Sequence, residues 1–239
     1  MNNQSQERVV KNNDVSGMPK YILILSMLYV ICFIFPMMMA YRMVEIGPFV
    51  IPGGTVFFAS SYVVGDIVTE VYGYQVARQL VWAAIITQLI LGLFITVIIH
   101  LPYPTGWHHE KDFLYVLGHS LRYAGASSIG NFFGEFCNIY IVSKFKVLMK
   151  GRFFWLRSMS SSLFGEAVLT CVVFFITFTG LNSHHEILKL VLDAYGYKML
   201  ISIVGIFPAA ILVRYLKNKE SIDVYDVAID FSPFKYTVT

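Results

Sequence analysis

The stretch YILILSMLYVICFIFPMMMA at residues 21–40 contains no charged side chain over twenty consecutive positions. A membrane-spanning helix needs about 20 mostly apolar residues to cross roughly 30 Å of hydrocarbon, so this stretch is long enough to span a bilayer. It is longer than the apolar core of a signal peptide, and no small-residue cleavage site follows it. We therefore expect it to remain in the mature protein as a first membrane span.

Apolar stretches of similar length recur along the chain. Of its 239 residues, 56% are hydrophobic and only 14% are charged, whereas a soluble domain carries about 25% charged residues. The composition therefore indicates a polytopic membrane protein, and a net charge of +3 without a basic patch excludes nucleic acid as a partner. We expect an all-α fold with six transmembrane helices at residues 21–40, 54–73, 79–99, 123–143, 158–181 and 199–213, the last beginning as early as residue 187.

The second span is preceded by a break. Residues 46–65 are uncharged, but Pro48, Pro52, Gly53 and Gly54 interrupt the first half. We therefore expect irregular chain up to Gly54, of the kind that lines cavities in transporters with interrupted helices. The chain then divides into a disordered cytosolic tail at residues 1–20, a transmembrane domain at 21–219 and a cytosolic C-terminal tail at 220–239.

Basic residues flank the predicted spans unequally. With the N-terminus in the cytosol, thirteen Lys and Arg lie on the cytosolic side: Arg8, Lys11, Lys20, Arg78, Lys144, Lys146, Lys150, Arg152, Arg157, Arg214, Lys217, Lys219 and Lys235. Five lie outside: Arg42, Lys111, Arg122, Lys189 and Lys198. Because cytoplasmic loops carry an excess of Lys and Arg, this imbalance predicts that both termini are cytoplasmic.

Four acidic residues lie within or at the ends of the spans: Asp66, Glu70, Glu135 and Glu166. Each costs roughly 2.5–3.5 kcal/mol at the bilayer centre on insertion scales, so such residues usually face an interior cavity and mark function. Polar or aromatic residues recur four positions apart on the same helices, which places them on one helical face. At about 1.5 Å per residue, three of the carboxylates lie roughly 10–12 Å from the cytosolic edge.

This shared level predicts a site for a polar ligand or ion. Its candidate residues are Phe58, Tyr62, Asp66, Asn131, Glu135, Asn138, Ser162, Glu166 and Thr170. The alternative is a set of buried hydrogen bonds that only holds the helices together. The basic residues between the fourth and fifth spans are expected to meet anionic lipid. Alternatively, Arg157 or Arg78 pairs with Glu70 or Glu166 and gates the cytosolic exit.

Motifs for enzymatic chemistry are absent. The sequence contains no GxxxxGK[ST], HExxH or GxSxG, so we expect neither an enzyme nor a cofactor. The pairs His108-His109 and His184-His185 offer imidazole ligands in outer loops, but adjacent His rarely bind one ion, and we predict no metal site. Gly130 and Gly134 form a GxxxG, which serves either packing within the chain or a homodimer.

Three stretches resemble one known family. They are DIVTEVYGYQVAR at residues 66–78, NIYIVSKFKVLMKGRFFWLRSMSSS at 138–162 and DVYDVAIDFSPF at 223–234. Together they are similar to the YhhQ-like queuosine-precursor transporters, also called the vitamin-uptake transporter family. The resemblance implies a six-helix inner-membrane importer of 7-deazaguanine bases for tRNA modification. The imported base would be the cyano or aminomethyl precursor of queuosine, or queuine itself.

The resemblance also implies how such a ligand is held. A guanine-like edge offers a ring N–H and an exocyclic amine, which one carboxylate can accept together. An amide such as Asn138 would read the neighbouring carbonyl, and Tyr62, Phe58 or Phe132 would stack on the ring.

One position departs from the family pattern, and two other functions stay open. The family has an acidic residue directly before a Thr or Ser in the fifth span, whereas Leu169 precedes Thr170 here and Glu166 lies one turn earlier. The first alternative function is a substrate-binding membrane subunit that needs a separate ATPase module. The second is a proton or metal transporter.

Overall fold

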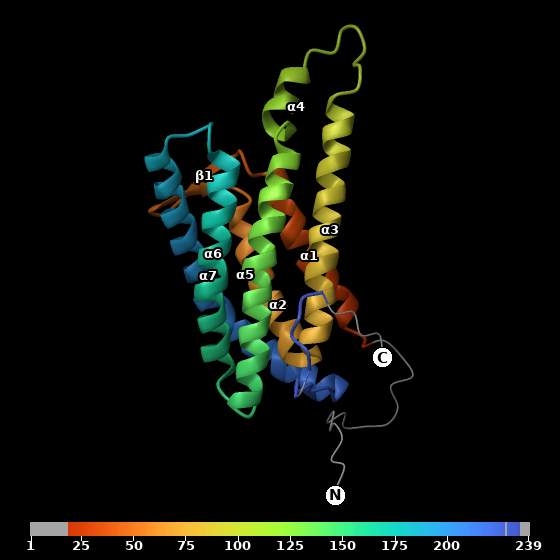
Figure 1. The fold of residues 1–239 in the computed structure, drawn as a ribbon, viewed down its shortest axis with the longest axis vertical. Helices are drawn as coiled ribbons and strands as arrows, with labels where there is room; N and C mark the ends of the chain where they lie inside the picture. The colour runs from red at the N-terminus through yellow and green to blue at the C-terminus, as the bar shows by residue number, and fades with distance from the viewer. Residues whose placement is uncertain (1–18, 228, 235–239) are drawn as a thin grey trace, which may run out of the picture.

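The structure is a computed structural model that describes residues 19–227 and 229–234, so the predicted N-terminal tail lies almost wholly outside the described residues. Six long helices run lengthwise beside one another as a bundle (Figure 1). They are α1 (Ile22–Met38), α2 (Thr55–Tyr72), α3 (Tyr74–Ile99), α5 (Ser120–Leu148), α6 (Phe154–Phe178) and α7 (His184–Glu220). A short helix that the sequence did not predict, α4 (Glu110–Leu117), precedes α5.

The long helices have the character of membrane helices. Three of them, α3, α6 and α7, are long and apolar enough to cross a membrane, and α1 is a shorter apolar helix of 17 residues. Large apolar side chains such as Ile98, Phe207 and Ile211 are more than three-fifths exposed on the outside of the bundle. An exposed apolar surface of this extent fits a lipid environment. The chain is therefore a multi-pass membrane protein.

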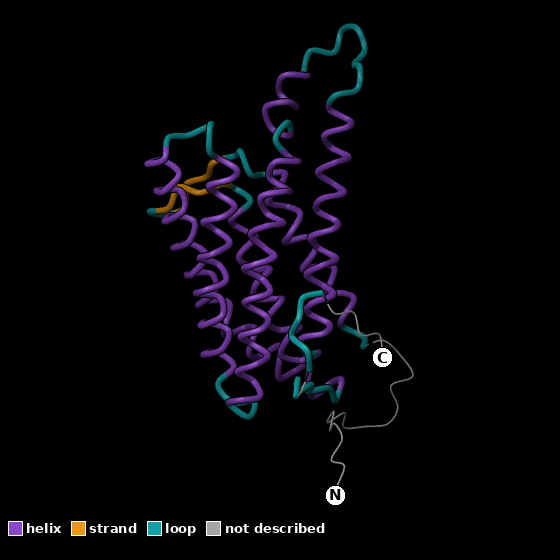
Figure 2. Tube along the Cα trace, in the orientation of Figure 1, coloured by secondary structure: helices purple, strands orange, loops and turns teal. Residues whose placement is uncertain are grey.

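The break before α2 is a β-hairpin rather than the expected irregular chain (Figure 2). Strands β1 (Met43–Ile46) and β2 (Phe49–Pro52) pair antiparallel, with Met43 opposite Pro52 and Ile46 opposite Phe49. Gly47 has a φ of +59°, which a two-residue hairpin turn requires. The fold is thus all-α apart from this hairpin. We call this end of the bundle the hairpin end, and the opposite end the terminus end.

Helix α7 is much longer than the predicted last span at residues 199–213. It has 37 residues, which corresponds to about 55 Å at 1.5 Å per residue. A capping box starts it, in which Ser183 accepts a hydrogen bond from the Glu186 backbone and Glu186 accepts one from the Ser183 backbone. The charged residues Lys189 and Lys198 favoured a loop in the sequence, but both belong to the helix. The other five predicted spans each fall on a helix.

The glycines of the GxxxG pack inside the protein. A Cβ atom on Gly134 would lie 2.6 Å from the Gly165 carbonyl oxygen on α6, and one on Gly130 would lie 2.7 Å from a Val173 methyl group. Helices α5 and α6 therefore approach each other backbone to backbone at this point. Of the two roles left open by the sequence, the structure shows packing within the chain.

The C-terminal segment after α7, residues 221–227 and 229–234, folds back across the terminus end. Asp226 Oδ2 accepts hydrogen bonds from the Tyr74 backbone N–H (2.8 Å) and the Ser143 hydroxyl (2.6 Å). Farther along, Arg78 donates to the Ser232 carbonyl and Trp82 Nε1 to the Pro233 carbonyl. The segment is thus held against α3 and α5.

Candidate functional site

Helix α2 supplies one wall of the predicted site. Phe58, Tyr62, Asp66 and Glu70 follow one another at intervals of four residues, and all four are at most 4% exposed. A helix with this spacing presents them as one stripe. The stripe faces the interior of the bundle, as the sequence predicted.

Asp66 joins three helices. Its Oδ1 accepts a hydrogen bond from Asn138 Nδ2 on α5 at 2.7 Å, and its Oδ2 accepts one from the Ser158 hydroxyl on α6. Both partners are buried. Both oxygens of Asp66 therefore have hydrogen-bond donors, which is not the case for Glu135 or Glu166.

Glu135 lies in the middle of α5 with no exposed surface. Neither of its carboxyl oxygens has a hydrogen-bond partner among the described residues. A Cβ atom on Gly65 of α2 would lie 3.8 Å from Glu135 Oε2, so the carboxyl group points toward α2. The buried hydroxyls of Tyr29 on α1 and Tyr62 on α2 also have no partner within 3.5 Å there, but the Tyr29 hydroxyl faces the Glu135 carboxyl group and interacts with it.

Glu166 on α6 faces α7. Its Oε1 accepts a hydrogen bond from the Ser202 hydroxyl at 3.0 Å, while its Oε2 has no partner in the described part of the chain. One turn later, Thr170 Oγ1 accepts a hydrogen bond from Lys198 Nζ at 3.0 Å. Lys198 is 2% exposed and interacts electrostatically with Glu166 and Glu135.

We call Asp66, Glu135 and Glu166, together with Asn131, Asn138 and Lys198, the carboxylate layer. The amide nitrogen of Asn131 is bonded to Ser127, and that of Asn138 is bonded to Asp66, so each amide leaves its oxygen without a partner. Asn138 therefore keeps its oxygen and one of its two N–H groups for a ligand, and its role toward a ligand carbonyl stays a prediction. Ser162 is buried on α6 but makes no hydrogen bond within the described residues.

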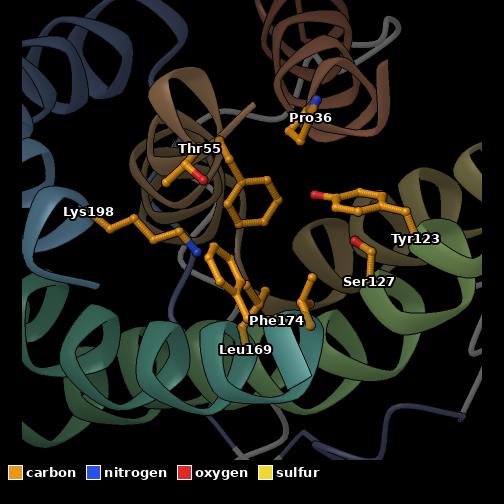
Figure 3. A pocket seen from close by; sticks show the side chains of 9 residues that line it. Pro36, Thr55, Tyr123, Ser127, Leu169, Phe174 and Lys198 are labelled. Carbon is orange, nitrogen blue, oxygen red and sulfur yellow. The ribbon is translucent and has the colours of Figure 1, made fainter. Parts of the chain in front are cut away.

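A cavity of about 20 Å³ lies on the hairpin side of the layer (Figure 3). Lys198 Nζ and the Tyr123 hydroxyl point into it from opposite sides. Its lining consists of Pro36, Thr55, Phe58, Tyr123, Ser127, Leu169, Val173, Phe174 and Lys198. A cavity of about 10–15 Å³ by this measure holds one water molecule. A heteroaromatic base would therefore enter only if lining side chains such as Phe58 moved.

Phe58 lines the cavity beside Lys198 and lies next to Tyr62. Its ring centroid lies 4.7 Å from Lys198 Nζ and 6.2 Å from the Tyr62 ring centroid. Leu169, which stands where the family resemblance implied an acidic residue, lines the cavity as an apolar wall. The carboxyl group on this face of α6 is that of Glu166, one turn away.

A second group of charges closes the terminus side of the layer. Glu70 accepts hydrogen bonds from Arg157 and Lys217, both at 2.7 Å, and Lys146 Nζ lies 3.9 Å from it. Asp223 of the C-terminal segment lies 2.7 Å from Lys146 Nζ and 2.9 Å from Lys217 Nζ. We call these five residues the Glu70 cluster. Lys146 and Arg157 are 1% exposed, so they do not reach lipid as the sequence suggested.

Arg78 does not belong to this cluster. It lies over the Tyr74 ring and donates to the Ser232 carbonyl, rather than pairing with Glu70 or Glu166.

The pKa values of two carboxyl groups in the C-terminal segment are shifted in opposite directions. Burial alone would raise the pKa of Asp223, but hydrogen bonds from Lys146 and Lys217 outweigh it and hold that pKa below its usual value. Burial raises the pKa of Asp226, and its hydrogen bonds from Ser143 and Tyr74 offset this only in part.

Sequence reasoning missed the contribution of α7. Lys198 and Ser202 lie four residues apart on its inner face and complete the surroundings of Glu166. Lys198 was counted among the residues outside the membrane, because the last span was expected to begin at residue 199. The alternative start at residue 187, which the sequence allowed, places both residues on one helix, and their spacing of four would have revealed this face.

The histidine pairs do not form a metal site in the structure. Among the residues it describes, no group of three or more His, Cys, Asp or Glu side chains is placed to hold a metal ion. His109 Nδ1 instead lies 3.1 Å from Asp112 Oδ2 on the exposed surface.

Comparison with known proteins identifies the family. Residues 52–213 match the family described as "Putative vitamin uptake transporter", and this region contains every residue of the carboxylate layer. The chain belongs to this vitamin uptake transporter family. It is also 26% identical over 180 residues to the queuosine precursor transporter of Escherichia coli strain K12, which covers 71% of this chain and 78% of that protein. No solved structure matches the chain. The family is one of transporters, not of enzymes.

Proposed function

We propose that the protein is a six-span importer of queuosine precursors, 7-deazaguanine bases or queuine, and that the carboxylate layer binds them. The observation that carries this proposal is the set of buried polar atoms without partners on α1, α2, α5 and α6 at one level of the bundle. An unpartnered buried polar group costs about 1–3 kcal/mol, and more when charged. A ligand rich in N–H donors would remove that cost on binding. The similarity to the queuosine precursor transporter of E. coli supports this substrate class.

The layer matches the donor pattern of such a base. Both oxygens of Glu135 are free, so the carboxylate would accept the ring N–H and the exocyclic amine of a guanine-like edge together. The unpartnered hydroxyl of Tyr62 would donate to the ring carbonyl. Phe58 and Tyr62 lie one turn apart on α2 and would supply aromatic surface for stacking, worth about 1–3 kcal/mol per base in other proteins.

The charge distribution supports an inward orientation of the terminus end. The α5–α6 connection lies at the same end of the bundle as the described C-terminal segment (Figure 1), and it carries the exposed residue Arg152. We infer that this end is cytoplasmic and that the hairpin end faces outward. A ligand would then enter through the Phe58 cavity and leave past the Glu70 cluster, whose ion pairs would have to open.

Reconstitution tests this function. The purified protein would be placed alone in liposomes, and uptake of a radiolabelled 7-deazaguanine precursor would be measured. We expect uptake by the wild-type protein, and a loss of at least tenfold for Glu135→Gln at equal protein content. Glu45→Gln is the matched control, because Glu45 is an exposed carboxylate of the hairpin. Normal uptake by Glu135→Gln would contradict the proposal.

The same assay separates a carrier from a binding subunit. A substrate-binding subunit that needs an ATPase module would bind the base in detergent but move none into liposomes. Uptake by liposomes that contain this protein alone, with no ATPase module added, would exclude that alternative.

A further inference from the structure

The C-terminal segment is fastened to α2 and α3 from residue 224 to residue 233. The Val224 backbone N–H donates to the Val71 carbonyl near the end of α2 at 3.2 Å. Asp226 accepts a hydrogen bond from the Tyr74 backbone N–H at the start of α3 at 2.8 Å. Three side chains of α3 donate to the carbonyls of residues 231–233: Tyr74, Arg78 and Trp82. The segment is therefore bonded to α2 or α3 near both of its ends.

The end of α7 is joined to α2 as well. Glu220, its last residue, accepts hydrogen bonds from the Tyr72 hydroxyl of α2 at 2.5 Å and from the Tyr21 backbone N–H at 3.0 Å. Lys217, one turn earlier, lies 2.9 Å from Asp223 of the segment. The segment follows Glu220 directly in the chain. We call the C-terminal segment, α2, α3 and the end of α7 the α2–α3 body.

Helices α5 and α6 form a second body, because their backbones approach each other closely at Gly134 and Gly165. Among the described residues, no backbone–backbone hydrogen bond joins this pair of helices to the C-terminal segment. The hydrogen bonds between α5 and the segment all come from side chains of α5.

Lys146 and Ser143 of α5 supply these hydrogen bonds. The Lys146 ammonium donates to the Glu70 carbonyl of α2 at 2.5 Å, and to the Val224 carbonyl at 2.6 Å and Asp223 Oδ1 at 2.7 Å in the segment. An ammonium group has three N–H donors, so Lys146 uses all of them here. Ser143, one turn earlier, donates to Asp226 at 2.6 Å. These two side chains clasp the segment to α5.

The exit for a ligand lies between the two bodies. Glu70 follows Asp66 by one turn of α2, so the Glu70 cluster covers the terminus side of the carboxylate layer. Arg157 of α6 and Lys146 of α5 both bond to Glu70 or its backbone. Water can replace such side-chain bonds at the end of the bundle, because a water-mediated hydrogen bond is nearly as favourable as a direct one. The exit therefore opens most readily where α5 and α6 separate from the α2–α3 body.

We propose that the C-terminal segment is the inner gate of the transporter. It stays on α2 and α3 throughout transport and releases α5 at Ser143 and Lys146 when the exit opens. This inference rests on the proposed function and adds the step that frees the ligand. A segment that only anchors the fold would instead stay on α5 throughout transport.

Two disulfide tethers distinguish these roles in a protein whose native cysteines are replaced. Ser143→Cys with Asp226→Cys would fasten the segment to α5, since the two native side chains lie 2.6 Å apart. Val71→Cys with Val224→Cys is the matched control, because it fastens the same segment to α2, where the two backbones are hydrogen-bonded. Loss of free thiols on oxidation would show that each tether has formed.

Uptake of the radiolabelled base into liposomes is then measured before and after oxidation. We expect the oxidised α5 tether to lower the initial rate of uptake at least tenfold, and dithiothreitol to restore it. The oxidised α2 tether should keep the rate of its reduced form. The oxidised α5 tether should still bind the base in detergent, because the tether lies outside the carboxylate layer.

Each other result has a defined meaning. Full uptake by the oxidised α5 tether would overturn the inference and leave the proposed function intact. Loss of uptake under both tethers would overturn it too, because the segment would then have to leave α2. Failure of the untethered wild-type protein to take up the base would overturn the proposed function, and the inference with it.

A second link to α5 serves if the reduced Ser143 and Asp226 variant does not transport. Tyr140 of α5 and Phe231 of the segment are in contact, with ring centroids 5.1 Å apart. Cysteines at these two positions would be joined by a short bis-methanethiosulfonate, which dithiothreitol cleaves. We expect the same reversible loss of uptake, and unchanged uptake by the linked protein would overturn the inference.

Discussion

Lys198 is the residue whose removal should most disturb the interior of the bundle. It interacts electrostatically with Glu166, and both side chains are at most 2% exposed. Lys198→Met would leave Glu166 without a nearby cation, and removing one member of a buried charge pair costs about 3–5 kcal/mol. Because Lys198 bonds to Thr170 rather than directly to Glu166, we expect a loss near the lower end of that range.

The matching double variant isolates the interaction. If Lys198 stabilises the protein by neutralising Glu166, then Glu166→Gln should restore part of the stability lost in Lys198→Met, with a coupling energy of about 0.5–3 kcal/mol. Thermal unfolding in detergent of the wild type, both single variants and the double variant measures this coupling. Strictly additive losses would show that Lys198 acts through packing alone.

Much of the polar site was predictable at the level of single residues. Asp66, Glu135 and Glu166 are acidic residues in apolar helices, and the cost of placing them there already indicates an interior position. The depth estimate placed them at one level, and in the structure Glu135 interacts electrostatically with both Asp66 and Glu166. Ser202 lies inside the predicted last span and Lys198 directly before it, but Lys198 was assigned to the outside and Ser202 was not singled out; both belong to α7, which begins at residue 184. Because Lys189 and Lys198 are charged, the sequence placed them outside the last span, and the helix start at residue 184 was not predicted.

At the scale of elements, the close contact between α5 and α6 depends on Gly130 and Gly134 of α5. A methyl group on Gly134 would lie 2.6 Å from a backbone oxygen of α6, which cannot move aside as a side chain can. We expect Gly134→Ala to destabilise the protein by about 1–3 kcal/mol, as overpacking typically does. Gly125→Ala on the same helix meets no atom within 4 Å and should be neutral or slightly stabilising. Equal melting temperatures for the two variants would contradict this packing.

The attachment of the C-terminal segment should depend on pH through Asp223. The pKa of Asp223 is held below its usual value, so its stabilising contribution is complete above about pH 4, the ordinary Asp pKa, and is lost as the pH falls through the lower, folded-state pKa. Asp223 is 41% exposed, so screening limits the effect to about 1 kcal/mol or less. The raised pKa of Asp226 acts in the opposite sense, because its contribution is largest at low pH.

Trp82 reports on this attachment, since its indole donates to the Pro233 carbonyl and its ring lies 5.9 Å from that of Phe234. In a background with Trp107 and Trp155 replaced by Phe, Asp223→Asn should shift the Trp82 emission toward that of an exposed indole at pH 7. It should also remove the part of the acid response that occurs below about pH 4. An unchanged emission and acid response would mean that Asp223 does not hold the segment.

Elements outside the long helices were less predictable than the helices. The prolines and glycines before α2 indicated a break, but they did not distinguish irregular chain from the hairpin of β1 and β2. Its strands have only four residues each. The hairpin is stabilised by contacts distant in sequence, such as the Val50 backbone N–H donating to Asp193 on α7 at 3.3 Å.

At the scale of the whole molecule, the proposed orientation makes a labelling prediction. With the native cysteines Cys32, Cys137 and Cys171 replaced, a new cysteine at Thr105 would lie at the hairpin end and one at Arg152 at the terminus end; both positions are exposed. A membrane-impermeant maleimide should label Thr105→Cys in intact cells and Arg152→Cys only after permeabilisation. The reverse labelling pattern would show that the hairpin end is cytoplasmic and would contradict the proposed orientation.

The central claim is that the carboxylate layer binds a 7-deazaguanine base, and a thermal-shift titration of the purified protein tests it most directly. A ligand that binds only the native state stabilises it by about 2.7 kcal/mol at one hundred times its Kd. We predict a concentration-dependent rise in melting temperature with the deazaguanine, none with adenine, and a loss of the response in Glu135→Gln. A deazaguanine response that Glu135→Gln retains in full would contradict the claim.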